Sequence, residues 1–509
     1  MLESIKDSPL YPMAHPESIA ICGASNSVNA MGTVLLMSLQ LLGFEGSIYP
    51  VHPREKTVRG LTAYRSVLDL PEVPDLAILV VPTQVGVQTL DECGRKGIKH
   101  AVVVTAGFRE VGGRGIALEN ELTAVAKKYG ISFIGPNCIG LANPYHKLNT
   151  TFMEYEGPPG FIGMASQSGS FVTQMFNYIS KFGLGFSTAF SVGNEAQIDI
   201  VDCMEYLGVC PHTKVIALYV EGIRRGRRFV EAARSIVPRK PIVALYVGGS
   251  EGGKRAGFSH TGAMAGPDRL YDGIFRQSGV VRVHSVTELY DACWVLGSLP
   301  KPRGNRLVIQ THSGGPGAVA ADSCGRAGLD LPPLSEETKE KLAPYIPHTA
   351  SIQNPVDLTF TKNPLDYLGT ILKTLLEENN ADMLLVYLLM VPRIVEQTML
   401  ELGVPEDRIP EQLRKLHDGM AGSVADLIQS HGKPIVGYTF RSLDEGIIKH
   451  FIERGIPVFP GHERAARALA AMARYVRLRE KLAAGESDAS AKGKAAAAGI
   501  YTTPHIPND

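Results

Sequence analysis

Cysteine, tryptophan and long apolar runs are scarce in this sequence, and each shortage excludes a class of protein. Its 509 residues include 7 cysteines and 1 tryptophan. The cysteine number is odd and no C-x-x-C pair occurs, which argues against a disulfide framework and favours reduced thiols in a cytosol. The longest apolar run, Met383 to Val391, is too short to cross a bilayer. No H-E-x-x-H motif is present, so no metal site is predicted.

Neither sign of charge is in excess. Lys plus Arg and Asp plus Glu each number 51, so the composition gives no electrostatic reason to expect nucleic acid or a membrane as a partner. The N-terminal segment Met1 to Asp7 lacks the apolar stretch of a signal peptide. We therefore expect a cytoplasmic protein. Hydrophobic residues make up 44% of the chain, which is long enough for two to four globular domains.

Residues 17–145 alternate short β runs with amphipathic stretches, which predicts a parallel, doubly wound sheet that binds ligands at the carboxyl ends of its strands. After the first strand, Gly23-Ala24-Ser25 has the composition of a nucleotide-phosphate turn opening a helix. It is a poor dinucleotide fingerprint, because only the distant Gly32 follows Gly23. The second strand ends in Val51-His52-Pro53, with no acid for a ribose hydroxyl. A nicotinamide dehydrogenase is thus disfavoured, and coenzyme A fits the mismatch.

A second unit begins near residue 150 and carries a strand, the turn Ser166-Gln167-Ser168-Gly169-Ser170 and a helix. Backbone N–H groups and hydroxyls at a positive helix end form an anion site. Ser166 stands where a nucleophile elbow needs glycine, which disfavours a hydrolase. Glu221 directly follows the strand at 215–220 and would face the ligand crevice, although a solvated loop acid is the alternative.

A glycine-rich loop, residues 248–263, follows the next strand and carries His260 between Ser259 and Thr261. Such a histidine can serve as nucleophile, acid or base. The same loop matches the start of a P-loop, but Arg255 replaces the hydroxyl residue that binds magnesium, which disfavours an NTPase. A surface loop with an inert histidine remains open from the loop alone.

A third unit starts after a Pro- and Gly-containing linker at 300–305, and its strand and turn at 306–317 repeat the pattern of the second unit. After Ala483 the sequence becomes low in complexity, and we expect it to be disordered. The predicted organisation is a Rossmann-like domain at 1–148, flavodoxin-like domains at 149–299 and 300–482, and a linker-like tail at 483–509.

Taken together, the junctions resemble the ADP-forming acyl-CoA synthetases, which are related to the succinyl-CoA synthetase alpha subunit. The resemblance covers residues 18 to 475, and its specificity lies in the order and spacing of many short motifs. These are Ile21 to Ser25, Val51 to Pro53, Ala106 to Glu110, Gly135 to Gly140, Ser166 to Gly169, Val192 to Asn194, Leu218 to Gly222, Ser259 to Gly262 and Asn354 to Leu358.

The resemblance implies a role for each matching residue. His260 corresponds to the phosphorylated histidine, and Glu221 to the glutamate that orients it. The predicted phosphate-binding residues are Ser168, Gly169 and Ser170, and the predicted CoA-binding residues are Gly23, Ala24, Ser25, Pro53, Pro136 and Asn137. His52 replaces the asparagine usual in the family, which leaves its share of CoA binding in doubt.

The implied reaction interconverts acyl-CoA, ADP and phosphate with a carboxylic acid, CoA and ATP, through acyl phosphate and phosphohistidine. Nothing in the chain resembles the ATP-grasp domain of the family, so the resemblance implies a separate ATP-grasp beta subunit that holds ATP or ADP with Mg²⁺, in a heterotetramer. The alternatives are a catalytically silent CoA- or acyl-CoA-binding regulatory protein, and a CoA transferase or hydrolase that works without nucleotide.

Overall fold

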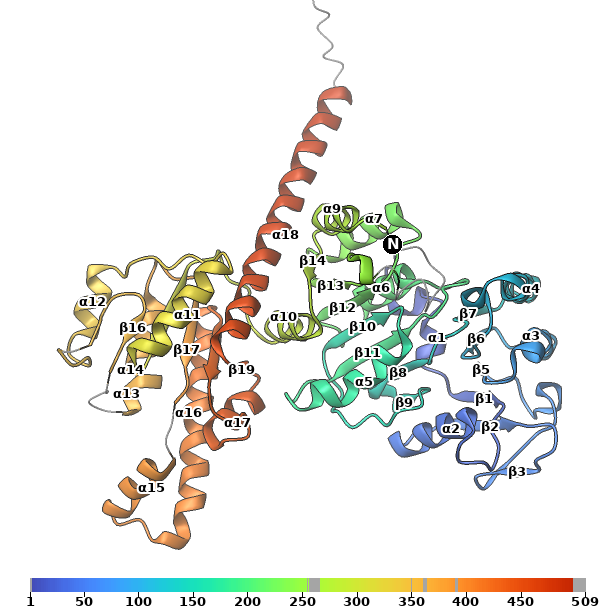
Figure 1. Ribbon diagram of the computed structural model, residues 1–509, viewed down its shortest axis with the longest axis horizontal. Coiled ribbons are helices and arrows are strands. Elements are labelled where there is room, and N and C mark those ends of the chain that lie inside the picture. The colour runs from blue at the N-terminus through green and yellow to red at the C-terminus, as the bar shows by residue number, and fades with distance from the viewer. Residues whose placement is uncertain are drawn as a thin grey trace, which may run out of the picture.

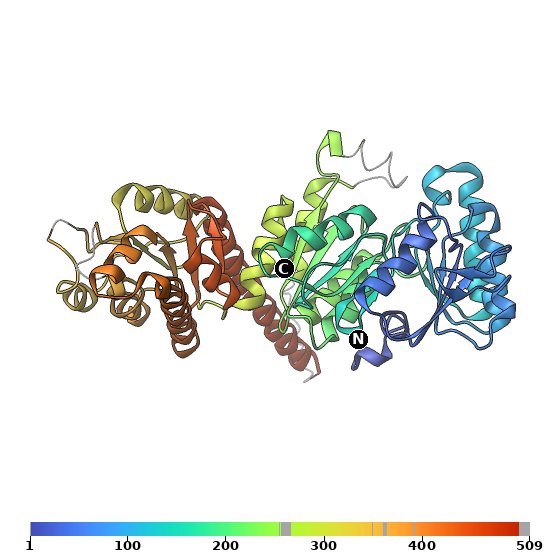
Figure 2. The same ribbon diagram turned by 90° about the horizontal axis from the view of Figure 1, so that it is seen from below.

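The structure is a computed structural model that describes residues 2–253, 255, 266–348, 350–359, 364–389 and 392–497. Three α/β units follow one another in chain order and lie in a row in the view of Figure 2. Their central strands are almost wholly buried, as expected for parallel strands covered by helices on both faces. The predicted α/β class is therefore correct.

The first unit is a five-stranded parallel sheet in the order β2-β1-β5-β6-β7. Its strands are β1 (Ser18–Cys22), β2 (Ser47–Val51), β5 (Leu76–Leu79), β6 (His100–Val103) and β7 (Ser132–Ile134). A hairpin of β3 (Thr57–Val58) and β4 (Leu61–Thr62) follows β2, and the main helices are α2 (Met31–Leu42), α3 (Thr83–Lys96) and α4 (Gly113–Tyr129). The strand order reverses between β1 and β5, where a ligand crevice is expected.

The second unit has seven strands in the order β14-β13-β12-β10-β11-β8-β9. Its strands are β8 (Leu141–Asn143), β9 (Leu148–Asn149), β10 (Ile162–Ser166), β11 (Phe186–Ser191), β12 (Val215–Val220), β13 (Ile242–Tyr246) and β14 (Val281–Val283). Its helices include α5 (Gly169–Ser180), α6 (Ile200–Val209), α7 (Gly226–Ile236), α9 (Asp268–Ser278) and α10 (Val286–Ser298). Because β8 pairs antiparallel with β11, the second unit begins before Leu141 rather than at residue 149.

The third unit repeats the flavodoxin-like order as β16-β15-β17-β18-β19. Its strands are β15 (Leu307–Thr311), β16 (Val356–Asp357), β17 (Met383–Tyr387), β18 (Ile435–Thr439) and β19 (Val458–Pro460). Its helices include α11 (Gly314–Arg326), α12 (Glu336–Leu342), α13 (Pro364–Leu368), α14 (Thr370–Glu377), α15 (Pro392–Glu401), α16 (Ile409–His431) and α17 (Gly446–Glu453). In both flavodoxin-like units, the strand that starts the unit's parallel sheet is followed by a turn and a helix N-terminus.

The last helix, α18 (His462–Ala497), extends into the segment at 483–509 that the sequence predicts to be a linker-like tail. It projects well beyond the sheets in Figure 1. Alanine and lysine, which are frequent in residues 483–497, have high helix propensity. Residues 498–509 lie outside the described part of the chain. Within the described residues, no helix has both the length and the hydropathy of a membrane span.

A largely buried ion pair joins α10 to α18 and so ties the second unit to the third. Arg464 Nε and Nη2 donate to the two Asp291 carboxylate oxygens at 2.9 and 2.6 Å, and the side chains are 18% and 6% exposed. Beside them, the Trp294 ring meets Phe459 at a centroid distance of 5.3 Å. Burial of both charges makes this pair sensitive to the loss of either partner.

Asp291→Ala should lower the free energy of unfolding by about 3 kcal/mol, because it leaves the Arg464 guanidinium buried without its counter-ion. Trp294 is the single tryptophan and lies in α10, so its fluorescence during urea unfolding reports on this contact. The control is Asp322→Ala, which removes an exposed ion pair with Arg326 and should change the value by less than ~1 kcal/mol. Equal unfolding midpoints for the two variants would contradict the importance of the α10–α18 pair.

Candidate functional site

The carboxyl ends of β10 and β12 lie side by side at the point where the strand order of the second sheet reverses. The two strands pair in parallel, with Ser166 opposite Tyr219. The turn to α5 leaves the end of β10, and Glu221 comes directly after β12. In open α/β sheets, ligands bind at this kind of crevice. The structure therefore places the predicted phosphate-binding turn and the predicted orienting acid at one edge.

The N-terminus of α5 offers backbone N–H groups for an anion. Ser168 is the N-cap residue and has extended backbone angles, and among the described residues no side chain caps the helix there. The turn is fixed by Ser166, whose hydroxyl donates to Ser168 O at 2.7 Å and accepts from Ser168 N at 3.1 Å. Ser170 is exposed in the first turn. Uncapped N–H groups at the positive end of a helix favour a phosphate.

Gly169 lets this helix end approach the first unit closely. A Cβ atom at Gly169 would lie 2.9 Å from Ile139 Cγ2 and 3.4 Å from Ser191 Oγ. The same Ser191 hydroxyl accepts a hydrogen bond from Ile139 N at 3.2 Å. A larger residue would push the anion site away from the loop that carries Pro136 and Asn137.

Gln167 connects the two halves of the edge with four hydrogen bonds. Its side-chain oxygen accepts from the backbone N–H groups of Glu221 and Gly222. Its side-chain nitrogen donates to Gly222 O at 2.7 Å and to Glu195 Oε2 at 2.8 Å. Gln167 is 7% exposed. Gln167 lies inside the Ser-Gln-Ser-Gly motif, but the sequence alone predicts no role for it.

Glu195 is a buried acid in a left-handed backbone conformation, with φ of 53° and 6% exposure. Burial raises the pKa of its carboxyl to about 7, and the nearby Asp199 charge acts in the same direction. Hydrogen bonds from Ile200 N and Gln167 and the charge of Arg224 lower that pKa in part. Sequence reasoning missed Glu195, because its burial follows only from packing between α6 and the turn before α5.

His260 lies outside the described residues, but the two ends of the segment that carries it do not. The segment leaves the sheet after β13, which neighbours β12. At the C-terminal end of the segment, Gly266 O accepts a hydrogen bond at 2.9 Å from the hydroxyl of Tyr246, the last residue of β13. The Tyr246 ring stacks on Tyr271 at 3.7 Å, and the Tyr271 hydroxyl accepts from Ile223 N at 3.3 Å. Both ends of the segment are thus anchored beside the strand end that carries Glu221.

Pro136 and Asn137 meet the second unit through backbone contacts. Asn194 N donates to Pro136 O at 2.8 Å, and Asn137 Nδ2 donates to Asn194 Oδ1 at 3.2 Å. Gly193 has φ of 56°, and a Cβ atom there would lie 2.3 Å from Pro136 O. Only glycine fits this close approach. The two predicted CoA residues therefore lie next to the segment that holds Glu195.

The remaining predicted CoA residues lie at the carboxyl ends of β1 and β2. Gly23, with φ of 104°, follows β1, and its N–H donates to Val51 O at 3.0 Å. Ala24 is buried, and Ser25 N donates to the Thr33 hydroxyl at 3.0 Å. Pro53 follows β2 and is exposed.

Residues 26–30 separate the turn from α2, so Gly23-Ala24-Ser25 does not open the helix directly as expected. The helix end still touches the turn, because a Cβ atom at Gly32 would lie 2.7 Å from Gly23 O.

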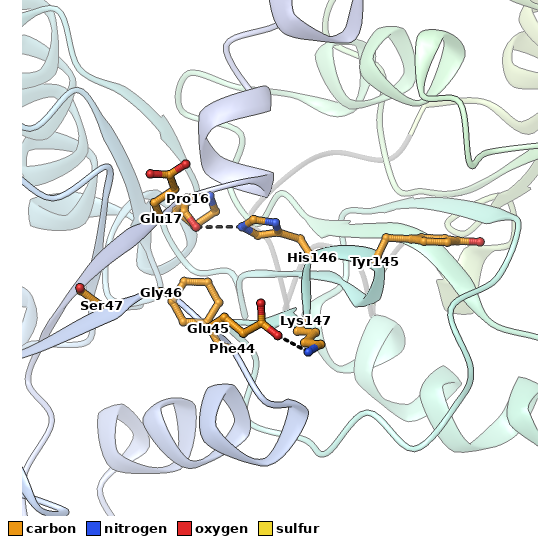
Figure 3. A pocket seen from close by; sticks show the side chains of 9 residues that line it. All are labelled: Pro16, Glu17, Phe44, Glu45, Gly46, Ser47, Tyr145, His146 and Lys147. Carbon is orange, nitrogen blue, oxygen red and sulfur yellow. Dashed lines mark hydrogen bonds and ion pairs between the residues drawn. The ribbon is translucent and has the colours of Figure 1, made fainter.

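A cavity of about 440 Å³ lies at the opposite edge of the first sheet (Figure 3). Glu17 and Ser47 line it where β1 and β2 begin, so it is remote from Gly23 and Pro53 at the strands' other ends. His146 Nε2 meets Pro16 O at 2.9 Å, and Lys147 pairs with Glu45. These contacts join the first unit to the segment after β8 and do not build a reactive site. Among the described residues, no three His, Cys, Asp or Glu side chains form a group suited to a metal ion.

Comparison with known proteins places the chain among CoA ligases. Family models described as CoA binding domain, succinyl-CoA ligase like flavodoxin domain and ligase-CoA domain match residues 17–144, 159–296 and 307–413. The chain is 38% identical to the acetate–CoA ligase [ADP-forming] II subunit alpha of Pyrococcus furiosus, over 90% of this chain and 96% of that subunit. It is 38% identical to acetate–CoA ligase [ADP-forming] I of Archaeoglobus fulgidus, over 74% of this chain but 54% of that protein.

A solved structure supports the same assignment. The dinucleotide forming acetyl-coenzyme A synthetase 1 of Ca. Korarchaeum cryptofilum, in complex with phosphate and ADP, superposes with a TM-score of 0.82 at 32% identity. The match covers 94% of this chain and 98% of that one. The chain therefore belongs to the ADP-forming acyl-CoA synthetase family, and within it to the alpha-type subunits of acid–CoA ligases.

Proposed function

We propose that this chain is the CoA-binding and phosphohistidine-bearing subunit of its ligase, with His260 as the group that is phosphorylated. The observation that carries the proposal is the shared edge of the second sheet. The uncapped N-terminus of α5 and Glu221 lie there together, and both ends of the segment that bears His260 are anchored beside them. An anion site, an acid and a tethered imidazole are the parts needed for phosphoryl transfer through histidine.

The proposed reaction of acyl-CoA, phosphate and ADP has three steps. Phosphate attacks the thioester carbon of the acyl-CoA, the C–S bond breaks, and acyl phosphate and CoA form. An imidazole nitrogen of His260 then takes the phosphoryl group, the P–O bond to the acyl group breaks, and the carboxylic acid leaves. Finally the P–N bond breaks as the terminal oxygen of ADP accepts the phosphoryl group to give ATP. The free N–H groups of Gly169 and Ser170, beside the Ser168 side chain, stabilise the phosphoryl charge during the second step.

Glu221 supports the second step through the imidazole tautomer. A carboxylate that accepts a hydrogen bond from one ring nitrogen leaves the other nitrogen unprotonated and able to attack phosphorus. CoA is a substrate on this scheme and would lie along the edge formed by Gly23 to Ser25, Pro53, Pro136 and Asn137. Its thioester end would reach the second unit where Asn137 contacts Asn194, next to the anion site.

On this proposal the nucleotide binds to a second chain. We assign ADP or ATP, with Mg²⁺, to an ATP-grasp beta subunit that assembles with this chain in a heterotetramer. This chain covers 54% of the Archaeoglobus fulgidus ligase, so that protein is long enough to include a nucleotide-binding part as well. It covers the Pyrococcus furiosus alpha subunit almost completely. The alpha designation of that subunit likewise supports a partner.

The phosphorylation itself can be tested with the purified full-length chain and radiolabelled phosphate. Acetyl-CoA, and in parallel a panel of branched-chain, aryl and dicarboxylic acyl-CoAs, should give an acid-labile, base-stable label. ATP with Mg²⁺ should give the same label when the ATP-grasp partner is co-expressed. The label should vanish in His260→Asn and persist in the control His284→Asn, which changes an exposed histidine of the same unit. A wild-type chain without label under both conditions would overturn the proposal.

Glu221→Gln should slow phosphorylation about 10- to 100-fold, because the amide no longer selects the attacking tautomer. CoA affinity, measured by titration calorimetry, should stay unchanged, since Glu221 lies in the second unit. Glu231→Gln is the matched control, because Glu231 is an acid of the same unit, 52% exposed on α7. An undiminished rate in Glu221→Gln would remove its orienting role.

A further inference from the structure

Gln167 can adopt only one orientation of its side-chain amide. Its oxygen faces two donors, the N–H groups of Glu221 and Gly222, and its nitrogen faces two acceptors, Gly222 O and Glu195 Oε2. Turning the amide over would set like groups against each other in all four contacts. At 7% exposure, water has little access to replace the lost bonds.

The Glu195 carboxylate favours this orientation of the Gln167 amide, and it contacts the amide on the side remote from Glu221. Its Oε2 accepts from Gln167, and its Oε1 accepts from Ile200 N at 2.8 Å, so both oxygens act as acceptors. The left-handed backbone of Glu195 is held by Arg224 Nη1, which donates to Glu195 O at 2.8 Å. A non-glycine residue in this conformation persists only where its surroundings determine it, and such residues cluster at functional sites.

We propose that Gln167, held in place by ionised Glu195, is a positioning residue that sets the backbone of Glu221 against the N-terminus of α5. This inference rests on the proposed function, because it concerns the acid that orients His260. The four side-chain hydrogen bonds of Gln167 all go to protein groups, so it acts through Glu221. The ionised Glu195 carboxylate is one of the two acceptors that hold the Gln167 nitrogen, and the only charged one of the two.

A proton on Glu195 would weaken the hydrogen bonds that its two oxygens accept from Gln167 and from Ile200 N, because a neutral carboxyl is a weaker acceptor than a carboxylate. The groups around the carboxyl are Asp199 and Cys203 from α6, Arg224 after β12 and Tyr271 from α9. Because burial raises the pKa of Glu195 to about 7, the acid is ionised above that pH and neutral below it. The positioned state is therefore expected to be lost as the pH falls through about 7.

The first variant is Gln167→Leu, studied in the full-length chain with acetyl-CoA and radiolabelled phosphate. The rate of chain phosphorylation at saturation should fall about 10- to 100-fold, whereas the acetyl-CoA concentration at half-maximal rate should change little. Gln197→Leu is the matched control, because among the described residues the exposed Gln197 side chain bonds to Phe133 N and Ile131 O, near β7 and away from Gln167. The control should stay within about twofold of the wild type.

The second variant, Glu195→Gln, keeps the proposal testable if Gln167→Leu fails to fold. The amide of this variant resembles the neutral acid. Its oxygen can accept from Ile200 N, but its nitrogen then faces the side-chain nitrogen of Gln167 and cannot accept from it. The wild-type rate should fall about 10-fold from its plateau when the pH is lowered to 6. Glu195→Gln should be about 10-fold slower than the wild type on the plateau, and the ratio of the two rates should approach one as the pH falls to 6, which cancels the titration of the imidazole and of phosphate.

The outcomes separate the two proposals. A wild-type chain that takes no label overturns the proposed function and this inference with it. A labelled wild type overturns the inference alone if a folded Gln167→Leu retains the full rate. The inference is likewise overturned if Glu195→Gln keeps the wild-type rate and pH profile. A slow Glu195→Gln whose rate approaches that of the wild type at pH 6, beside an active Gln197→Leu, supports it.

Discussion

The unfilled hydrogen bonds at the N-terminus of α5 are the constraint around which the second unit is arranged. A helix end that has no side-chain cap and whose turn is 7% exposed at Ser168 needs an anion or water to satisfy its N–H groups. Around it the chain places glycine at position 169, so that the first unit can approach, and an acid at the end of β12. The positive N-terminus of α5, which attracts an anion, thereby lies beside the Glu221 carboxylate, which repels one. On the proposed function, this arrangement lets phosphate both bind and leave.

Two short segments make the contact between the first and second units rigid. Residues 135–137 and 192–196 both contain positive-φ residues, and their backbones bond to each other directly. Asn194 also donates to Glu110 and to the buried Glu119, so an amide from the second unit joins two acids of the first. A thioester held along Pro136 and Asn137 would then have a fixed relation to α5, which is the condition for attack by a bound phosphate.

Much of the fold could be predicted from the sequence, because buried parallel strands appear as apolar runs and their turns carry Gly and Ser. That Ser168, Gly169 and Glu221 lie at one edge could be predicted for the same reason, because residues that follow neighbouring parallel strands meet there. Gln167 and Glu195 were not found, since their roles depend on a contact between a turn and a loop 28 residues apart in sequence. The antiparallel pairing that joins β8 and β9 to the second sheet could not be predicted, because local sequence does not encode it.

The anchor at Gly266 limits where the partner can present its nucleotide. Residues 260 to 266 span six peptide units, and an extended chain covers about 3.5 Å per residue, so the His260 backbone stays within roughly 20 Å of Gly266. Gly266 is fixed by Tyr246 at the end of β13, on the same edge as Glu221. On the proposed function, the beta subunit must therefore bring ADP to this edge of the second unit. A nucleotide bound beside α15, which lies far from α9 at the other end of the third unit in Figure 1, would be out of reach, whatever affinity the partner had for that helix.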